Sequence, residues 1–520
     1  MNRTVISVIL LFSAKFAQMT KMKAVYDFFS SRYFLYAFAA FAVIVYLSGL
    51  SVALLGPDEP RYAQVAREMF ERGDWVTPTL GSHNWFEKPA LLYWLQIASY
   101  NIFGVGELAA RFGSALFGLG TIMCLWIFGN TAESDPNERS YISGKLLAVV
   151  AASTLGLLVF SRGASFDIIL TFPITASLTA FFVFDRMPKE NGNRYWALVL
   201  FYFFIGLAVL AKGLVGIVFP FAIVTFYHVL SFKLPQKVLV FSLIWGTLLA
   251  AAVASLWYVP MYGRHGYNFI DEFFIQHHFQ RYTSNKYQHP QPFHFFFWVL
   301  PLMTIPWIPF FFTQIWHSIK VTIARYKKTS EEKLPSAVVF AFAWMLVPLV
   351  FFSLSGSKLP GYILPAVPAA LILAAESIGR FVFKKNERHV WVKALATATL
   401  VIVFVIIHVA LPKFAEVDSV KGLIAAADAR GYSQSNVAGF LTISHNAEFY
   451  AAKRLLRNYD GRQKRLGNLG ELDDQVRVEN RPLLILLKKE HIKHLSEDAA
   501  ISYDVLADNG ELAIAAVTRR

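Results

Sequence analysis

Two adjoining stretches decide the fold: 34–55, FLYAFAAFAVIVYLSGLSVALL, and 56–94, GPDEPRYAQVAREMFERGDWVTPTLGSHNWFEKPALLYW. The first is an unbroken apolar run of the length that a bilayer-spanning helix needs. The second places Asp58, Glu59, Glu87 and Lys88 directly after it. A charge at the edge of hydrocarbon is costly unless it is paired, metal-bound or used. The pattern therefore predicts a membrane helix followed by a functional loop.

The composition extends this prediction to the whole chain. Of its 520 residues, 56% are apolar and 16% are charged, with a mean hydropathy of +0.45, whereas soluble proteins carry roughly 25% charged residues. The net charge of +14 is concentrated in short loops between apolar runs. That distribution orients membrane helices and indicates no nucleic-acid partner. The single Cys124 lies inside an apolar run, which excludes a disulfide framework and a thiolate metal site.

Apolar runs predict a polytopic α-helical membrane protein. Eleven spans are expected, at 34–55, 108–130, 143–160, 166–184, 195–211, 213–230, 238–259, 293–315, 336–355, 360–378 and 391–411. The apolar stretch 89–104 is short and is expected to be re-entrant or interfacial. If such stretches also cross, the total rises to twelve or thirteen.

Lysine and arginine set the orientation, because cytoplasmic loops are enriched in them. The loops 316–335 and 380–390 are rich in both, whereas the opposite short loops hold one cation each, Arg162, Lys212 and Lys358. The segments 56–107, 260–292 and everything after 411 are therefore expected outside the cytoplasm. Residues 5–14 resemble a weak signal-peptide core without a clean cleavage site. We expect 1–33 to be a cytoplasmic or interfacial extension and 34–411 the transmembrane domain.

The last stretch, 412–520, has a different composition, rich in charge. Strand-like pieces occur at 437–443, 482–487 and 511–517, and helix-like pieces at 419–431 and 446–456. Strands that alternate with helices predict a small α/β domain, here on the periplasmic side.

Polar residues of mixed type gather in the loops predicted to be outside. They are Asp58, Glu59, Arg61, Trp85, Glu87, Lys88, Arg162, Asp167, Lys212, the histidines of 265–294, Arg281, Lys358 and Tyr362. Each has a structural alternative: the first two acids could cap a helix, Glu87 and Lys88 could form a local ion pair, Arg162 could pair with Asp167, and either lysine could anchor a helix end. A structural role for all of them together is improbable.

Such a site suits an anionic, membrane-tethered substrate. Lysine and arginine neutralise phosphate, and arginine does so with two parallel hydrogen bonds. An acid and a histidine can hold a divalent metal, zinc, magnesium or manganese, that offsets further phosphate charge. Membrane lipids are the remaining expected partners.

The motifs DEPRYAQVAREMFERGDWVTP…FEKPALLYW, AKG, HHFQRY and SKLPGYILP resemble the lipid A aminoarabinose transferase family. These are bacterial GT-C glycosyltransferases of family 83, related to protein mannosyltransferases, and the resemblance covers about residues 34–380. It implies a polyprenyl-phosphate sugar donor, an acceptor on lipid A or lipopolysaccharide, and an inner-membrane location with the active site facing the periplasm. The implied fold is a GT-C bundle of about thirteen helices with a periplasmic α/β domain.

The resemblance also implies roles for individual residues. Asp58 matches the catalytic loop acid, Lys88 a donor-phosphate contact, and Glu87 with His278 a metal pair. His277 stands where the family often has an acid, so either histidine can be the ligand. The remaining matches and expected substrate-binding residues are Glu59, Arg61, Trp85, Arg162, Asp167, Lys212, Arg281, Lys358 and Tyr362, with Asp167 also counted as catalytic.

Three other functions remain open at this stage. A galacturonosyl or hexosyl transferase acting on lipopolysaccharide core, or a protein mannosyltransferase, would keep the reaction and change the sugar or acceptor. A transporter of lipid-linked sugars is less favoured, because transporters place polar groups near mid-membrane.

Overall fold

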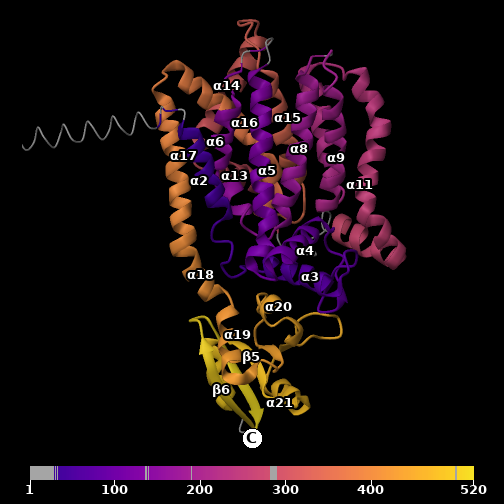
Figure 1. Ribbon diagram of the computed structural model, residues 1–520, viewed down its shortest axis with the longest axis vertical. Helices are drawn as coiled ribbons and strands as arrows, with labels where there is room; N and C mark the ends of the chain where they lie inside the picture. The colour runs from indigo at the N-terminus through magenta and orange to yellow at the C-terminus, as the bar shows by residue number, and fades with distance from the viewer. Residues whose placement is uncertain are drawn as a thin grey trace, which may run out of the picture.

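The computed structural model describes residues 29, 31, 33–134, 138, 140–188, 190–280, 290–497 and 500–520, without the side chains of 277–280. It consists of a helical bundle and a smaller β-sheet region that ends the chain, below the bundle in Figure 1. The bundle helices are α2 (Tyr33–Leu47), α5 (Glu107–Glu133), α6 (Gly144–Ala152), α7 (Leu155–Phe160), α8 (Phe166–Arg186), α9 (Arg194–Lys212), α10 (Val215–Ser231), α11 (Lys237–Ile270), α13 (Phe295–Met303), α14 (Ile308–Tyr326), α15 (Ser336–Ser353), α16 (Val367–Lys384) and α17 (Arg388–Val405).

Every apolar run predicted to span the membrane is helical. Seven described helical stretches are long and apolar enough to cross, and the pair α13–α14, bent by 119°, makes an eighth. The other predicted spans fall on α2, α10 and the broken pair α6–α7, which are shorter than the roughly 20 residues that a full crossing needs. Length and composition therefore support fewer complete spans than the eleven predicted.

Burial separates the centre of the bundle from its lipid-facing edge. The helical stretch Pro360–Lys384, formed by the 3₁₀ turn η2 (Pro360–Ala366) and α16, has 94% of its apolar window buried. The corresponding share is only 22% for the stretches that contain α11 and α17, which lie at opposite edges in Figure 1. A helix that is apolar all round belongs in a protein core or in lipid, so these outer faces suit a bilayer.

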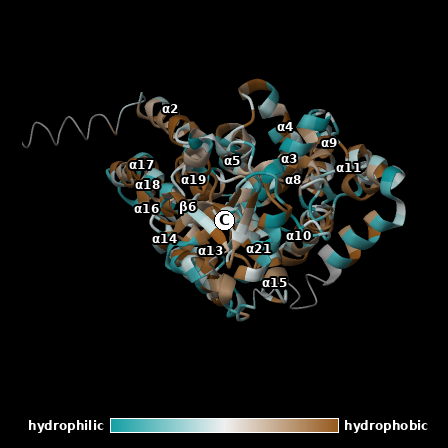
Figure 2. Ribbon diagram, turned by 90° about the horizontal axis from the view of Figure 1, so that it is seen from below, coloured by the Kyte–Doolittle hydropathy of each residue, from teal (hydrophilic) through white to brown (hydrophobic). Residues whose placement is uncertain are grey.

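The segment 56–104 closes one end of the bundle. It forms α3 (Asp58–Arg72), the hairpin strands β1 (Thr79–Leu80) and β2 (His83–Asn84), and α4 (Leu91–Phe103). α3 ends at Gly73, whose φ of 64° is the left-handed conformation that glycine adopts readily. α3 and α4 lie across the lower end of the bundle in Figure 1, and Figure 2 shows hydrophilic residues along α3. The run 89–104 thus forms one short helix at the end of the bundle, and its interfacial position stays a prediction.

The chain leaves the bundle through α17, a π-helical turn η3 (Ile406–Ala410) and α18 (Leu411–Asp418). The five-stranded sheet that follows has the order β4-β3-β5-β7-β6. The two β3 pairings are parallel, and the β5–β7 and β6–β7 pairings are antiparallel. The strands are β3 (Val437–Phe440), β4 (Arg465–Leu466), β5 (Leu483–Lys488), β6 (Ile501–Asp508) and β7 (Leu512–Arg519).

Alternating side chains of β5 build a core on each face of this sheet. Leu484 and Leu486 pack into one cluster with α19 (Lys421–Ala427), while Leu483 and Ile485 pack into the other with α21 (Leu469–Val478). The helix expected at 446–456 is only the single turn α20 (Ala447–Tyr450) and a 3₁₀ turn, η5 (Ala452–Arg454).

Candidate functional site

The first turn of α3 presents Asp58 and Arg61. The Arg61 guanidinium lies 2.7 Å from Asp58 Oδ1 and also donates to the Pro57 carbonyl at 2.8 Å. It lies over the Trp85 ring, 6.0 Å from the centroid, which brings the next loop against α3. The Asp58 side chain is 50% exposed. An acid at a helix N-terminus is stabilised by the helix dipole, and this one remains accessible.

Glu87 and Lys88 lie deeper. Lys88 Nζ is 2.7 Å from Glu87 Oε1, and the two side chains are only 14% and 13% exposed. The hydroxyl groups of Tyr62 and Tyr93 are buried beside them: burial, reinforced by the negative charge of Glu87, raises the pKa of both tyrosines well above the usual value. Both tyrosines are therefore neutral donors at physiological pH, next to a carboxylate.

A second polar group comes from three distant segments. Lys212, at the end of α9, places Nζ 2.6 Å from Asp167 Oδ1 in the first turn of α8, and 4.8 Å from the centroid of the Tyr362 ring. Gly361 makes this approach possible, because a Cβ there would lie 1.9 Å from Asp167 Oδ2. The alternative pairing of Asp167 with Arg162 does not form.

Phe166 joins the two groups. Its ring contacts Tyr62 edge-on at 4.9 Å and Tyr93 at 5.5 Å, and the next residue along α8 is Asp167. The acids and cations of 58–88 and the Asp167–Lys212–Tyr362 group therefore form one neighbourhood, at the bundle end nearest the sheet (Figure 1).

Glu59 has internal partners, although it is adjacent to the exposed Asp58. Its carboxylate accepts from the backbone amides of Leu55 and Ala164, at 2.8 and 2.7 Å, and from Arg111 Nη2 at 2.6 Å. Burial alone would raise its pKa, but the charge and hydrogen bond of Arg111 and these two amides outweigh burial, so the pKa lies below the usual value. Glu59 thus ties together three chain segments.

Arg162 and Lys358 also contact backbone. Arg162 donates to the carbonyls of Val45 and Ser48, both at 2.5 Å, where the first bundle helix ends. Lys358, only 6% exposed, donates to the carbonyls of Ser355 and Gln291 at 2.6 and 3.0 Å. Helix-terminal carbonyls need such donors. Lys358 therefore matches its structural alternative, an anchor near a helix end, whereas Arg162 binds the end of α2 and not Asp167 as its alternative proposed.

For three of the predicted site residues, His277, His278 and Arg281, the structure does not describe the side chain. Arg281 is not described, and neither are the side chains of His277 and His278. Among the described residues no group of three or more histidine, cysteine or acidic side chains converges as metal ligands. The metal pair Glu87 and His278 stays a prediction.

Three residues of this neighbourhood were not predicted from the sequence. In the sequence, Arg111 resembles an ordinary interfacial cation at the start of a long helix. In the structure it is only 4% exposed and forms an ion pair with Glu59. Tyr62 and Tyr93 fit the ordinary apolar faces of α3 and α4. The Tyr93 hydroxyl is buried and makes no hydrogen bond among the described residues. The only signal in the sequence is the position of Tyr62, about one helical turn after Asp58.

Residues 30–272 match the model of the dolichyl-phosphate-mannose-protein mannosyltransferase family. Among curated proteins, the undecaprenyl phosphate-α-4-amino-4-deoxy-L-arabinose arabinosyl transferase of Yersinia enterocolitica is 31% identical over 342 residues, 65% of this chain and 58% of the relative. The same enzyme of Aeromonas hydrophila is 29% identical over 62% of this chain and 56% of its own. The matched segment spans less than two thirds of these relatives.

Solved structures show the same fold along nearly the whole chain. ArnT from Cupriavidus metallidurans, bound to undecaprenyl phosphate, superposes with a TM-score of 0.71 at 22% identity, over 94% of this chain and 98% of that one. The archaeal oligosaccharyltransferase AglB from Archaeoglobus fulgidus gives 0.54 at 12% identity, over 89% of this chain and 70% of that one. The expected resemblance and GT-C fold are confirmed, and the chain is a multi-span membrane protein.

Proposed function

We propose that this ArnT-like chain is a glycosyltransferase that moves a sugar from a polyprenyl-phosphate donor to lipid A or a related acceptor. One observation carries the proposal: two polar groups, one with Asp58, Arg61, Glu87 and Lys88 and one with Asp167 and Lys212, are linked through Phe166 at one end of an apolar bundle. Charged groups at the end of an apolar bundle indicate a functional role, because placing them there costs free energy. The relatives from Yersinia enterocolitica and Aeromonas hydrophila, named for an undecaprenyl-phosphate sugar, support the donor class.

Two parts of the site would serve two parts of the reaction: Lys88 the departing phosphate, and Asp58 the attacking acceptor. In the proposed reaction the acceptor attacks the anomeric carbon of the sugar, and the bond to the polyprenyl phosphate breaks. Lys88, nearly buried, would stabilise the charge that develops on the departing phosphate. Low exposure strengthens such a contact because little water screens it.

Asp58 would act on the acceptor side of the reaction, where the side chain must be open to an incoming molecule. It is the most exposed of the four paired acids, at 50% against 13% for Glu59, 14% for Glu87 and 18% for Asp167. That exposure suits contact with an incoming acceptor. With a hydroxyl acceptor Asp58 is the general base, whereas a phosphate acceptor is already anionic and needs no strong base.

We further propose an inner-membrane location, with this site and the region 412–520 facing the periplasm. The support is the lysine and arginine bias of the loops. A divalent metal at Glu87 and His278 or His277 is the remaining proposal, supplying charge neutralisation at the phosphate; no step above depends on it. A transporter is disfavoured because the paired groups of the candidate site, Asp58, Glu87, Lys88, Asp167 and Lys212, lie at one end of the bundle.

The test is sugar transfer by the purified protein in detergent or nanodiscs, with a radiolabelled polyprenyl-phosphate sugar. Asp58→Ala, Glu87→Ala and Lys88→Ala should each abolish transfer without preventing membrane insertion. Asp504→Ala, which removes an exposed acid of β6 at a distance from the site, is the matched control and should keep full activity. Normal transfer by all three site variants would refute the assignment.

The match to the mannosyltransferase model favours one second candidate, transfer of a hexose to protein or to lipopolysaccharide core. Mass spectrometry of lipid A from cells with and without the gene separates the two, since each sugar adds a different mass. An unchanged lipid A spectrum, together with a hexose on protein or core, would select the second candidate.

A further inference from the structure

A second polar cavity lies at the other end of α3. Its volume is about 730 Å³, and it is lined by Glu68 and Arg72 of α3, His83 of the hairpin, and Lys453, Arg457 and Lys464 of the C-terminal region. Asp58 and Arg72 are the first and last residues of α3. At 1.5 Å per residue they are about 21 Å apart. The cavity is therefore distinct from the site around Asp58.

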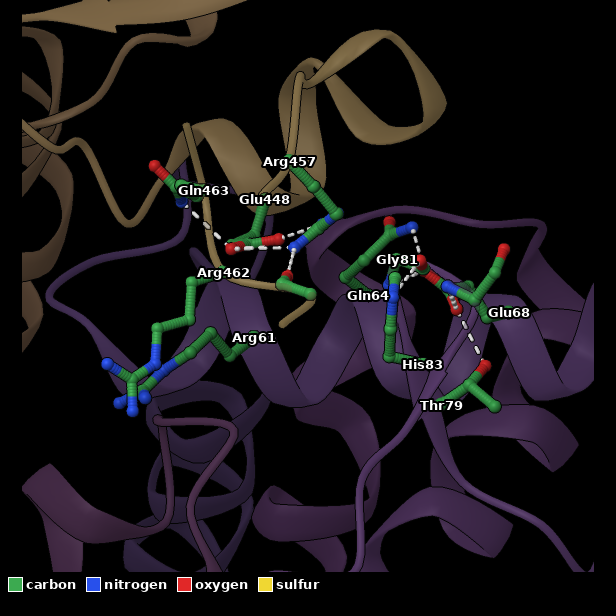
Figure 3. Close-up of polar contacts among 12 residues, drawn as sticks. Arg61, Gln64, Glu68, Thr79, Gly81, His83, Glu448, Arg457, Arg462 and Gln463 are labelled. Carbon is green, nitrogen blue, oxygen red and sulfur yellow. Dashed lines mark hydrogen bonds and ion pairs between the residues drawn. The ribbon is translucent and has the colours of Figure 1, made fainter. Parts of the chain in front are cut away.

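The bundle side of the cavity is held by Glu68, a residue only 7% exposed. Its carboxylate accepts from Thr79 Oγ1 at 2.6 Å and from the Gly81 amide at 2.7 Å, contacts that Figure 3 shows. Arg72 donates to the Thr77 carbonyl at 2.8 Å. The hairpin and the last turn of α3 thus form one fixed wall.

The opposite wall is fixed in the same manner. Glu448, 4% exposed, forms an ion pair with Arg457 and accepts from Gln463 Nε2 at 2.9 Å (Figure 3). A Cβ on Gly81, whose φ is +61°, would lie 1.9 Å from Arg457 Nε. The two walls are therefore in contact at Gly81, where only a glycine leaves room for the Arg457 side chain.

The charge of the lining is positive. The segment 453–465 carries six lysines and arginines against the single acid Asp460. Lys453 pairs with Glu71 at 2.8 Å, but Glu71 is also shared with Arg67. Lys464 donates to the side-chain oxygen of Gln475, a neutral group. A basic run is usually a solvated face. Here three of its members, Lys453, Arg457 and Lys464, line a cavity whose carboxylates already have cationic partners.

We propose that this cavity binds a phosphorylated sugar headgroup: the part of the acceptor glycolipid remote from the atom that receives the sugar. The proposal rests on the proposed function. Oriented cations suit phosphate, and the volume lies in the range of small-molecule sites. The cavity residues Glu68 and Arg72 lie about 15 to 21 Å from Asp58 along α3, so an acceptor that reaches both sites needs a headgroup larger than one sugar. Tyr459, which is fully exposed at the rim, offers a ring to a sugar face.

The first experiment measures binding directly, by calorimetry on the full chain in detergent with glucosamine 6-phosphate as the probe. The phosphosugar should bind and unphosphorylated glucosamine should not. Lys464→Glu should weaken binding about tenfold or more, and Lys464→Arg should restore it. Lys489→Glu, which changes an exposed lysine paired with Asp508 on the far strands, is the matched control. Equal binding by Lys464→Glu and the wild type would overturn the proposal.

Membrane phospholipids carry the same phosphate chemistry. The measurement is therefore repeated in nanodiscs of phosphatidylcholine with and without phosphatidylglycerol. Unchanged phosphosugar binding supports an acceptor site. Loss of binding whenever phosphatidylglycerol is present would assign the cavity to a bilayer headgroup and overturn the proposal.

The second experiment uses transfer kinetics. Lys464→Ala should raise KM for a phosphorylated acceptor about tenfold and leave kcat and the donor KM unchanged, since a contact equal in ground and transition states changes KM alone. With an acceptor lacking the remote phosphate, wild type and variant should be equal. If the wild type transfers no sugar, the proposed function fails while phosphosugar binding still tests the cavity. If it transfers normally and Lys464→Ala keeps the wild-type KM, the cavity proposal fails alone.

Discussion

The two ends of helix α3 contrast in origin and in exposure. At its start, Asp58 and Arg61 meet Glu87 and Lys88, all supplied by the segment between the first two long bundle helices. At its end, the cavity takes more than half of its lining from the C-terminal region. At the first site the cation Lys88 is 13% exposed, whereas the cations of the second range from Arg457, 10% exposed, to Lys453, 81% exposed.

This contrast indicates a division of labour. Low exposure strengthens electrostatic contacts, as stabilising a leaving phosphate requires. Exposed, paired cations give modest affinity and select a partner by charge. We therefore expect changes at the start of α3 to alter the chemical step, and changes at its end to alter recognition of the acceptor.

The largest expected effect concerns Glu59, the buried support of the first site. Glu59→Ala leaves Arg111 without its carboxylate at a position only 4% exposed. Removing one partner of a buried ion pair costs about 3–5 kcal/mol. Thermal unfolding in detergent should show this loss, while Asp58→Ala, one residue away and half exposed, should remain near the wild type. Equal stability of the two variants would contradict the distinction between them.

The same residue predicts a pH dependence. The folded pKa of Glu59 lies below the usual value of 4.5, because Arg111 and two amides outweigh burial. The stabilisation is therefore fully present above that value and is lost as pH falls through the folded pKa. The stability difference between wild type and Glu59→Ala should be large at pH 7 and should narrow below pH 4.5. A difference independent of pH would show that the charge of Glu59 is not what matters.

Lys88 and Lys464 give the most direct comparison between the two ends. Lys88→Ala removes a nearly buried cation and should abolish steady-state transfer, since losing one preorganised electrostatic contact lowers kcat by about 10²–10³. Lys464→Ala should leave kcat unchanged. Single-turnover and steady-state kinetics on both variants check this. If both lysines changed only the acceptor KM, the division between chemistry and recognition would be wrong.

Gly361 packs against Asp167, which forms an ion pair with Lys212 in the first site. In Gly361→Ala the added Cβ meets Asp167 Oδ2 at 1.9 Å, so Asp167 must move away from Lys212. Overpacking of this kind typically costs about 1–3 kcal/mol. We expect reduced kcat with moderate destabilisation. The control Gly422→Ala adds a Cβ with open space around it on α19 and should behave as the wild type.

Sequence reasoning located the elements better than their contacts. The apolar runs predicted every bundle helix because bilayer length and hydropathy are local properties, and strands β3, β5 and β7 followed from short apolar stretches. The partners of Glu59, Arg162 and Lys358 depend on segments up to about a hundred residues away. Spacing could not separate exposed Asp58 from buried Glu59, since both stand in the first turn of one helix.

The smallest expected effect tests how the C-terminal region is attached. The Tyr450 hydroxyl accepts from the Leu54 amide at 2.9 Å and donates to Glu107 at 3.0 Å, which links α20 to both the first loop and α5. Tyr450→Phe removes these contacts at a cost of about 1 kcal/mol. Loosening this attachment should raise the acceptor KM a few-fold and change the donor KM less, because the cavity at the end of α3 takes most of its lining from the C-terminal region. An equal rise in both constants would show that the region supports the first site as well, and would join the two ends of α3 into one functional unit.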